Sequence, residues 1–283
     1  MNYSKSLDTK YIIKRALRED IGKQDITTAT IIPKNKYAKA ILLAKENCVI
    51  CGLGIAKEVF KTQDKNIKFK AQVLEGQKIK KGKIIARIFA KAQSILIAER
   101  VALNFLNLLS GIATKTRAYV DKVKPYKVKI LDTRKTIPGL RELEKYAVRI
   151  GGGFNHRLRL DEMILIKDNH LKVTKGYQRL LKVTKGYLVE IEVKNLREFK
   201  EAIKAKPDII MLDNMNPKNI RQAVKIRNSQ LPTPNSKLPT KLEASGRINL
   251  KNVKNIAATG VDMISIGELT HSVNSADISL EIL

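Results

Sequence analysis

Short apolar runs and amphipathic segments alternate along the second half of the chain. Each apolar run ends in a cluster of polar residues, and several segments between the runs carry apolar residues at the 3.6-residue period of a helix. This alternation is typical of a parallel sheet whose faces are covered by helices, and therefore of an α/β fold. The predicted strands are residues 128–131, 163–166, 188–193, 208–212, 241–244 and 262–266, and the predicted helices include 140–150, 196–205 and 217–228.

Residues 1–120 follow a different pattern. An amphipathic helix is predicted to end near Gly22, and glycine-punctuated apolar segments at 39–52 and 68–90 are predicted as strands. Residues 94–123 carry a long helical pattern with one apolar face, which we expect to be interrupted at Ser110-Gly111. This helix would connect the two differently organised parts of the chain.

The composition indicates a globular protein with a sizeable core. The chain has 283 residues, of which 43% are hydrophobic, and its charges are mixed in sign. It contains no run of about 18 apolar residues, which argues against a membrane span. Residues 1–20 lack an apolar core followed by a small-residue cleavage site, so they do not resemble a signal peptide.

The two cysteines, Cys48 and Cys51, form a lone C-x-x-C, and the closest histidine in the sequence is His156. A redox or metal site would need a second pair or nearby histidines. We therefore expect two unpaired strand thiols in a reducing, cytoplasmic environment.

The net charge of +28, from 55 Lys and Arg against 27 Asp and Glu, raises nucleic acid as a partner. The surplus is mostly lysine, dispersed singly, and few aromatic residues are available for base stacking. Such a distribution is more typical of a solvated surface with non-specific affinity for polyanions at low salt. A basic nucleic-acid-binding protein remains the alternative from a different functional class.

Candidate chemistry gathers at the carboxyl ends of the predicted parallel strands, which is where α/β barrels hold their active sites. Arginines and lysines there suit a ligand with more than one carboxylate or phosphate, and small residues before a helix suit a phosphate. Carboxylates could hold Mg²⁺ on a polyphosphate or offset a cationic transition state. The candidates are Arg134, Lys135, His156, Arg157, Lys167, Glu192, Asp213, Ser245, Gly246 and Gly267.

Taken singly, each candidate also has a structural interpretation. His156 alone would more often be a structural histidine with satisfied hydrogen bonds than a ligand. Glu190 and Glu192 alternate in EIEV, which would allow one of the pair to face outward. The functional interpretation depends on joint placement, because unrelated polar residues would be scattered between both ends of the sheet and the helices.

Several long motifs resemble one known family. They are ERVALNFLNLLSGIAT (99–114), LDTRKTIPGLR (131–141), GGGFNHRLRLDEMILIKDNH (151–170), EIEV (190–193), MLDNM (211–215), LEASG (242–246) and GVDMISIGELTHS (260–272). In this order they resemble the quinolinate phosphoribosyltransferases, also called nicotinate-nucleotide pyrophosphorylases (carboxylating). The resemblance covers nearly the whole chain.

The resemblance implies an open, incomplete α/β barrel with a smaller N-terminal α/β sandwich domain. The implied bounds are 1–115 for the N-terminal domain with its bridging helix, 116–270 for the catalytic barrel, and 271–283 for a segment that returns to the N-terminal domain. It also implies a homodimer, or a higher oligomer, with a shared active site. The implied reaction, in de novo NAD biosynthesis, makes nicotinate mononucleotide, CO₂ and pyrophosphate from quinolinate and phosphoribosyl pyrophosphate with Mg²⁺.

The resemblance also implies roles for individual residues on the quinolinate side. Arg134, His156 and Arg157 would form the dicarboxylate pocket, with Thr133 beside them, and Arg100 would reach quinolinate from the partner subunit. The motif LDTRKTIPGLR contains a third cation besides Arg134 and Lys135. This residue, Arg141, is the weakest candidate of the motif.

Four residues are implied to be catalytic. Lys135 and Lys167 would lie between quinolinate and the ribose donor, and Glu192 and Asp213 would face the ribose and its Mg²⁺. The 5-phosphate would be held by Ser245, Gly246, Arg247, Ile266, Gly267 and Glu268.

The sequence departs from the family pattern in two places near the site. Arg247 stands where the family often has Gly or Asn, so the phosphate loop would gain a cation. The segment between His170 and Glu192 is short and contains KVTKGY twice, at 172–177 and 182–187. The nearest rival within the same fold is a molybdenum-transport-associated paralogue with another acceptor; the intact DTRKTIPGLR and NHR elements favour quinolinate.

Overall fold

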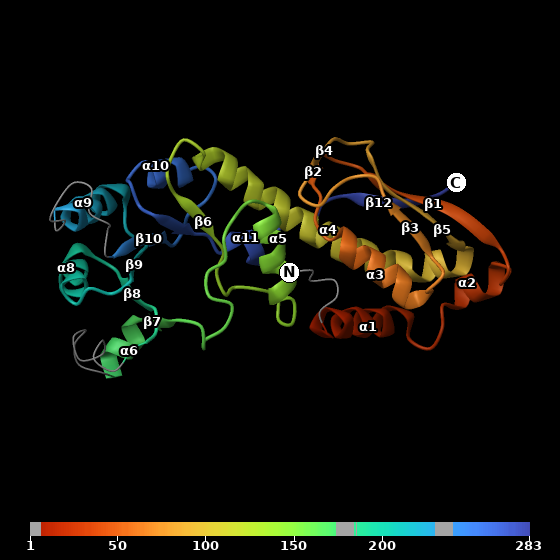
Figure 1. The fold of residues 1–283 in the computed structure, drawn as a ribbon, viewed down its shortest axis with the longest axis horizontal. Helices are drawn as coiled ribbons and strands as arrows, with labels where there is room; N and C mark the ends of the chain where they lie inside the picture. The colour runs from red at the N-terminus through yellow and green to blue at the C-terminus, as the bar shows by residue number, and fades with distance from the viewer. Residues whose placement is uncertain (1–6, 174–183, 185, 230–239) are drawn as a thin grey trace. The chain divides into compact units, whose positions relative to one another are not determined.

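The computed structural model describes residues 7–173, 184, 186–229 and 240–283 (Figure 1). Much of the KVTKGY duplication, and of the short segment around it, lies outside these residues.

The chain separates into two compact units. Unit 1 comprises Met1–Arg117, Ile137–Gly152 and Val273–Leu283, and unit 2 comprises Ala118–Thr136 and Gly153–Ser272. The bounds implied by the resemblance place residues 137–152 in the catalytic domain; by their contacts these residues group with unit 1.

Unit 1 contains a four-stranded antiparallel sheet in the order β12-β1-β5-β3. Strand β12 pairs with β1 over Ala40–Ala44, so residues far apart in the sequence form one sheet. Helix α1 packs against α3, whose apolar face is buried. The elements of unit 1 are α1 (Leu7–Ile21), α2 (Ile26–Ile31), β1 (Tyr37–Ala44), β2 (Cys48–Val49), α3 (Leu53–Gln63), β3 (Lys68–Ala71), β4 (Lys78–Ile79), β5 (Ile84–Lys91), most of α4 (Ala92–Val123), α5 (Arg141–Ile150) and β12 (Ile278–Ile282).

Close packing explains why α5 belongs to unit 1. The hydroxyl of Tyr146 donates to Glu75 at 2.8 Å. A side chain at Gly151, just after α5, would lie 2.5 Å from Cβ of Thr116 on α4, so only glycine permits this approach of the two helices. These contacts connect residues that are separated in the sequence, and a pattern read along the chain cannot show them.

Helix α4 runs without interruption through Ser110-Gly111, so the predicted break is wrong. Ser110 is buried and its hydroxyl donates to the carbonyl of Cys51 at 3.1 Å. A Cβ at Gly111 would lie 2.3 Å from the carbonyl oxygen of Asn274, so this glycine permits a close backbone approach. By length and composition α4 could cross a membrane, but 61% of its most apolar window is buried, as in the core helix of a globular protein.

Cys48 and Cys51 are free and buried, which confirms that the two thiols are unpaired. Burial raises the pKa of Cys48 to about 11, and the pKa of Cys51 also lies well above the ordinary value. A thiol that stays protonated is a poor nucleophile, so the pair is structural.

Unit 2 contains a six-stranded parallel sheet in the order β6-β11-β10-β9-β8-β7, and all six predicted strands are confirmed. Among the described residues β6 and β7 form the two edges, so the sheet is open, as expected for an incomplete barrel. The elements of unit 2 are the end of α4, β6 (Lys129–Leu131), β7 (Ile164–Ile166), α6 (Asp168–Val173), β8 (Val189–Val193), α8 (Leu196–Lys204), β9 (Ile209–Asp213), α9 (Pro217–Asn228), β10 (Lys241–Ser245), α10 (Val253–Ala257), β11 (Met263–Ser265) and α11 (Glu268–His271).

Helices α8 and α9 of unit 2 begin at capping residues. Asn195 caps α8 by accepting from the N–H of Glu198, and Asn216 caps α9, which has Pro217 in its first turn. Helices α8 and α9 pack against each other, and α8 also covers β8 and β9 (Figure 1). The chain therefore turns into a helix directly after β8 and β9, which leaves polar loops at the carboxyl edge of the sheet.

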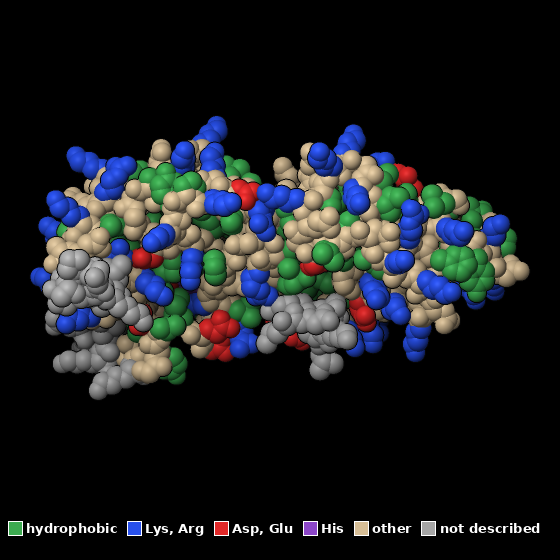
Figure 2. Space-filling model, turned by 45° about the horizontal axis from the view of Figure 1, so that its top comes forward, with side chains coloured by type: hydrophobic (Ala, Val, Ile, Leu, Met, Phe, Trp, Pro, Cys, Tyr) green, Lys and Arg blue, Asp and Glu red, His purple; other side chains and the backbone are tan. Residues whose placement is uncertain are grey.

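Lysine and arginine side chains are spread over the visible face in Figure 2, among apolar and neutral side chains. This distribution agrees with the dispersed lysines of the sequence.

Candidate active site

A cavity of about 700 Å³ lies at the carboxyl edge of the parallel sheet in unit 2. Every candidate in unit 2 lines it, which fits the expectation that strand ends gather one site. Among the described residues the lining includes Thr133, Arg134, Lys135, His156, Arg157, Lys167, Glu192, Asp213, Ser245, Gly246, Arg247, Ile266, Gly267 and Glu268. It also includes Asn214, Asn249 and His271, which sequence reasoning had not selected.

Arg100 and Arg141 belong to unit 1. Arg100 is exposed on α4, and Arg141 is the first residue of α5. Neither lines the cavity of unit 2.

One wall of the cavity carries two guanidinium groups. Arg157 donates from Nη1 to the carbonyl of Met163 at 2.8 Å. The Nε atoms of Arg157 and Arg134 are buried and have no hydrogen-bond partner among the described residues. Burial, followed by the charge of Arg134, lowers the pKa of Arg157 from its ordinary value, and Glu190 opposes this shift. Two neighbouring cations with unused N–H groups form a site that an anion would complete.

Lysines and carboxylates occupy the strand ends next to these arginines. Lys167 Nζ lies 3.3 Å from Glu192 Oε2, and Asp213 Oδ1 accepts from the side chain of Asn214 at 2.9 Å. The backbone of Lys135 is held on both sides, because its N–H donates to Thr133 Oγ1 at 3.1 Å and its carbonyl accepts from Thr270 Oγ1 at 2.7 Å. Because its backbone is fixed in this way, Lys135 presents its side chain from a defined position at the cavity.

The loops after β10 and β11 bring backbone close to the cavity. Gly246 has φ +94°, and a Cβ there would lie 2.4 Å from Oδ1 of Asn214. Arg247 has φ +50°, in the left-handed region that favours glycine, so this arginine occupies a strained position. A Cβ at Gly267 would lie 3.2 Å from Cδ of Lys135. Glycine is therefore required at Gly246, and a side chain at Gly267 would crowd Lys135 and His271, so both loops bring their backbone close to the cavity, as a phosphate subsite needs.

Glu268 follows Gly267 and would bring a negative charge to the same subsite. Its carboxylate accepts a hydrogen bond from the hydroxyl of Tyr119, which is fully buried near the end of α4. Burial and this carboxylate raise the pKa of Tyr119 above its ordinary value, so the phenol remains a donor. Tyr119 was not selected from the sequence, because a single tyrosine in a helix shows no pattern of its own.

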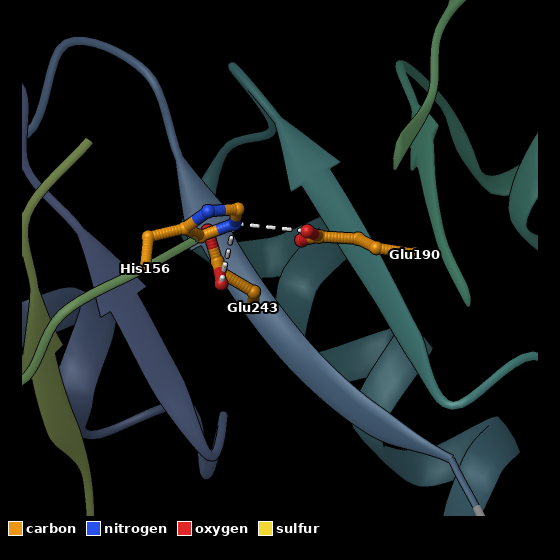
Figure 3. A group of neighbouring side chains, drawn as sticks. All are labelled: His156, Glu190 and Glu243. Carbon is orange, nitrogen blue, oxygen red and sulfur yellow. Dashed lines mark hydrogen bonds and ion pairs between the residues drawn. The ribbon is translucent and has the colours of Figure 1, made fainter. Parts of the chain in front are cut away.

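Below the cavity, three side chains meet in the interior of unit 2 (Figure 3). Glu190 from β8 and Glu243 from β10 are fully buried, and both point toward the imidazole of His156. Nε2 of His156 lies 2.9 Å from Glu190 Oε2 and 3.9 Å from Glu243 Oε2. The idea that Glu190 or Glu192 could face outward is wrong: residues i and i+2 of a strand share a face, with Glu192 at the cavity and Glu190 beneath it.

Both buried glutamates resist ionisation. Burial raises the pKa of Glu190 and of Glu243 to about 8. The positive charges of Arg157 and Lys167 act against this for Glu190, whereas neighbouring carboxyls raise the pKa of Glu243 further. Glu243 was missed from the sequence, although a carboxylate inside the apolar run LEAS was an available signal.

Replacing Glu243 with glutamine is expected to weaken the dependence of stability on pH. The pKa of this carboxyl rises from 4.5 to about 8 on folding, so the folded protein retains a proton that the unfolded chain releases. The free energy of unfolding then falls as the pH rises between these values, by at most ~1.4 kcal/mol per pH unit. Glutamine does not ionise, so the variant should not show this fall in the free energy of unfolding. Urea unfolding at pH 5 and pH 8 would measure the effect, and the same pH dependence in both proteins would contradict it.

Two family models match consecutive parts of the chain. The model described as quinolinate phosphoribosyl transferase, N-terminal domain, matches residues 25–110, and the model for the C-terminal domain matches residues 112–281.

Relatives match over nearly the full length. The chain is 43% identical to a protein of Methanocaldococcus jannaschii designated a probable nicotinate-nucleotide pyrophosphorylase (carboxylating), over 96% of each chain. It is 39% identical to a Bacillus subtilis protein of the same designation, over 98% of this chain and 94% of the relative. The solved structure of the nicotinate-nucleotide pyrophosphorylase of Francisella tularensis superposes with a TM-score of 0.89 at 39% identity, covering 98% of this chain and 96% of that one. This chain therefore belongs to the quinolinate phosphoribosyl transferase family.

Proposed function

We propose that this protein transfers the phosphoribosyl group of phosphoribosyl pyrophosphate to quinolinate, with loss of CO₂, to give nicotinate mononucleotide and pyrophosphate in NAD biosynthesis. Its relatives carry the name of this activity. The observation that carries the assignment is that two neighbouring arginines, Arg134 and Arg157, line the same cavity. Quinolinate has two adjacent carboxylates, which suit two neighbouring guanidinium groups.

The reaction needs positioning and charge more than it needs a nucleophilic side chain. When pyrophosphate leaves, the ribose develops oxocarbenium character, and the carboxylates of Glu192 and Asp213 favour this positive charge. The pyridine nitrogen of quinolinate forms the new bond to that carbon. The resulting positively charged ring accepts the electron pair that is released when the 2-carboxylate departs as CO₂, and a proton then takes the place of the carboxylate.

We assign Lys135 and Lys167, which both line the cavity, to the boundary between quinolinate and the ribose donor. Lys167 is within 3.3 Å of Glu192, so it can contact the dicarboxylate while remaining paired with the ribose-facing carboxylate. Lys135 lies next to Gly267, so it can reach both substrates. We assign the 5-phosphate to the loops of Ser245-Gly246-Arg247 and Ile266-Gly267-Glu268, where glycines permit a close approach of the ligand to the backbone.

The residues present fit Mg²⁺ bound mainly through the substrate. Glu192 and Asp213 offer carboxylate oxygens to the cavity, and Mg²⁺ prefers to combine one or two carboxylates with phosphate oxygens and waters. When bound, the ion would neutralise charge on the leaving pyrophosphate. Glu192 and Asp213 are the residues that would hold it.

We also propose a homodimer in which Arg100 of one copy completes the quinolinate pocket of the other. Arg100 is exposed on unit 1, as a residue that acts in a partner's site must be. A cytoplasmic location agrees with the two free cysteines.

The direct test is incubation of the purified protein with quinolinate labelled in its 2-carboxylate, phosphoribosyl pyrophosphate and Mg²⁺. We expect CO₂, pyrophosphate and nicotinate mononucleotide in equal amounts, and a loss of activity on addition of EDTA that excess Mg²⁺ reverses. Absence of labelled CO₂ would overturn the proposed reaction. Full activity in EDTA would overturn only the role of Mg²⁺.

A further inference from the structure

The hydrogen bonds of His156 determine which of its nitrogens carries the proton. The backbone N–H of Arg157 donates to Nδ1 at 2.9 Å, and a backbone N–H can only donate. Nδ1 is therefore the unprotonated nitrogen of a neutral ring, and Nε2 carries the hydrogen. That hydrogen points to Oε2 of Glu190 at 2.9 Å (Figure 3). Both ring nitrogens are thus engaged within the protein, although the ring reaches the cavity wall.

This arrangement argues against a metal ion at the cluster of His156, Glu190 and Glu243. Their ligand atoms lie within 4.8 Å of one another, a spacing that could surround a cation. A histidine that ligates through Nε2 needs a free lone pair there and usually donates from the other nitrogen. Here Nδ1 accepts, so Nε2 holds a proton in place of a metal.

The same hydrogen bonds anchor one of the two arginines proposed to bind quinolinate. The N–H of His156 donates to Asp132 Oδ1 at 2.9 Å, which ties this backbone to the end of β6. The imidazole then holds the N–H of Arg157, and the carbonyl of Met163 holds the guanidinium at Nη1. Arg157 is therefore fixed at both ends where it lines the cavity.

Glu190 and Glu243 differ in the hydrogen bonds that they accept. One oxygen of Glu190 faces the Nε2–H of His156, whereas neither oxygen of Glu243 has a hydrogen-bond partner among the described residues. A fully buried carboxylate without a donor is costly, so the neutral acid is the form of Glu243 that fits its site.

We infer that Glu190 is a positioning residue of the quinolinate subsite: by accepting the Nε2–H of His156 it orients the ring that anchors Arg157. His156 then acts through Arg157 rather than through a proton exchanged with substrate. Glu243 packs beside the ring without holding it. This inference rests on the proposed function only for its kinetic test.

The tautomer can be tested without any substrate. The chain has three histidines, so ring ¹⁵N resonances can be assigned with His170→Gln and His271→Gln variants. We expect His156 to show an unprotonated Nδ1 and a protonated Nε2 throughout pH 6 to 8, and to keep the Nε2 proton on addition of Zn²⁺. A proton on Nδ1, an imidazolium at pH 7, or loss of the Nε2 proton on addition of Zn²⁺ would overturn the inference.

Steady-state kinetics then test positioning with matched substitutions. Methionine has nearly the shape of glutamate but accepts no comparable hydrogen bond, so Glu190→Met should raise the quinolinate KM about tenfold or more by leaving a buried donor unsatisfied. The KM for phosphoribosyl pyrophosphate and kcat should change much less. Glu190→Gln, which keeps an acceptor oxygen, should restore a nearly normal quinolinate KM.

Glu243→Met is the matched control, because it makes the same change at a carboxyl that holds no donor. Its quinolinate KM should stay near the wild-type value. Equal effects of Glu190→Met and Glu243→Met, or a Glu190→Gln variant as impaired as Glu190→Met, would overturn the positioning role. If Glu190→Met does not fold, the tautomer of the wild-type protein and the quinolinate KM of Glu190→Gln decide the matter. Inactivity of the wild-type protein would contradict the proposed function and leave the tautomer result standing.

Discussion

Replacing Arg134 with alanine is expected to raise the quinolinate KM by about a hundredfold, since one charge-assisted bidentate contact contributes roughly 2–3 kcal/mol. Arg134 lines the cavity, and its buried Nε has no partner among the described residues, so no protein group there neutralises the guanidinium through this atom. Removing the guanidinium would leave one carboxylate of quinolinate in a partly desolvated site with too few donors. The KM for phosphoribosyl pyrophosphate should change little, because the ribose-facing carboxylates are untouched.

Arg141→Ala is the control for this measurement. Arg141 comes from the same motif and undergoes the same loss of charge, but it begins α5 in unit 1 and does not line the cavity. Its quinolinate KM should match the wild type. An unchanged quinolinate KM in Arg134→Ala would remove Arg134 from the dicarboxylate pocket.

Replacing Asp213 with asparagine is expected to lower kcat by about a hundred- to a thousandfold, a magnitude typical of losing one preorganised electrostatic group. Asp213 ends β9 at the cavity, where its negative charge would act on the positive charge that develops at the ribose. Asparagine keeps the shape and the hydrogen-bonding oxygen but removes the charge. Because the charge matters most in the transition state, the quinolinate KM should change far less than kcat.

Asp208→Asn tests whether the fall in kcat depends on the place where the charge is removed. Asp208 lies just before the same strand at its opposite end, where Oδ2 accepts from the N–H of Val189 at 2.8 Å. The same loss of charge there should leave kcat nearly unchanged. A raised KM with an unchanged kcat in Asp213→Asn would indicate that Asp213 binds substrate without stabilising the transition state.

The strands of unit 2 were predictable because each is a short apolar run, and helices α8 and α9 because each begins at a capping residue. Asn195 and Asn216 mark the starts of α8 and α9 in the sequence itself. The joint position of the candidates followed as well, since all strands of a parallel sheet end at one edge. The roles of single residues came from the family resemblance, because periodicity cannot distinguish a ligand from a surface charge.

The errors have one physical origin, which is contact between distant residues. Gly111 looked like a helix break, yet its lack of a side chain accommodates the carbonyl of Asn274. Glu243 interrupts an apolar strand and gains meaning only beside His156 and Glu190, which come from other parts of the chain. Residues 137–152 follow a strand of unit 2 but group with unit 1 by their contacts, and no local sequence pattern indicates this grouping.

The discontinuity of unit 1 has a consequence for the order of folding during synthesis. Unit 1 takes β12 from residues 278–282, so all of unit 2 leaves the ribosome before the sheet of unit 1 has its last strand. Domains tend to fold as they emerge, and here the unit that starts first must finish last. Until then β1 presents an unpaired edge, which is the kind of surface that recruits strands from other chains. The nascent protein is therefore most prone to misassociation late in its synthesis.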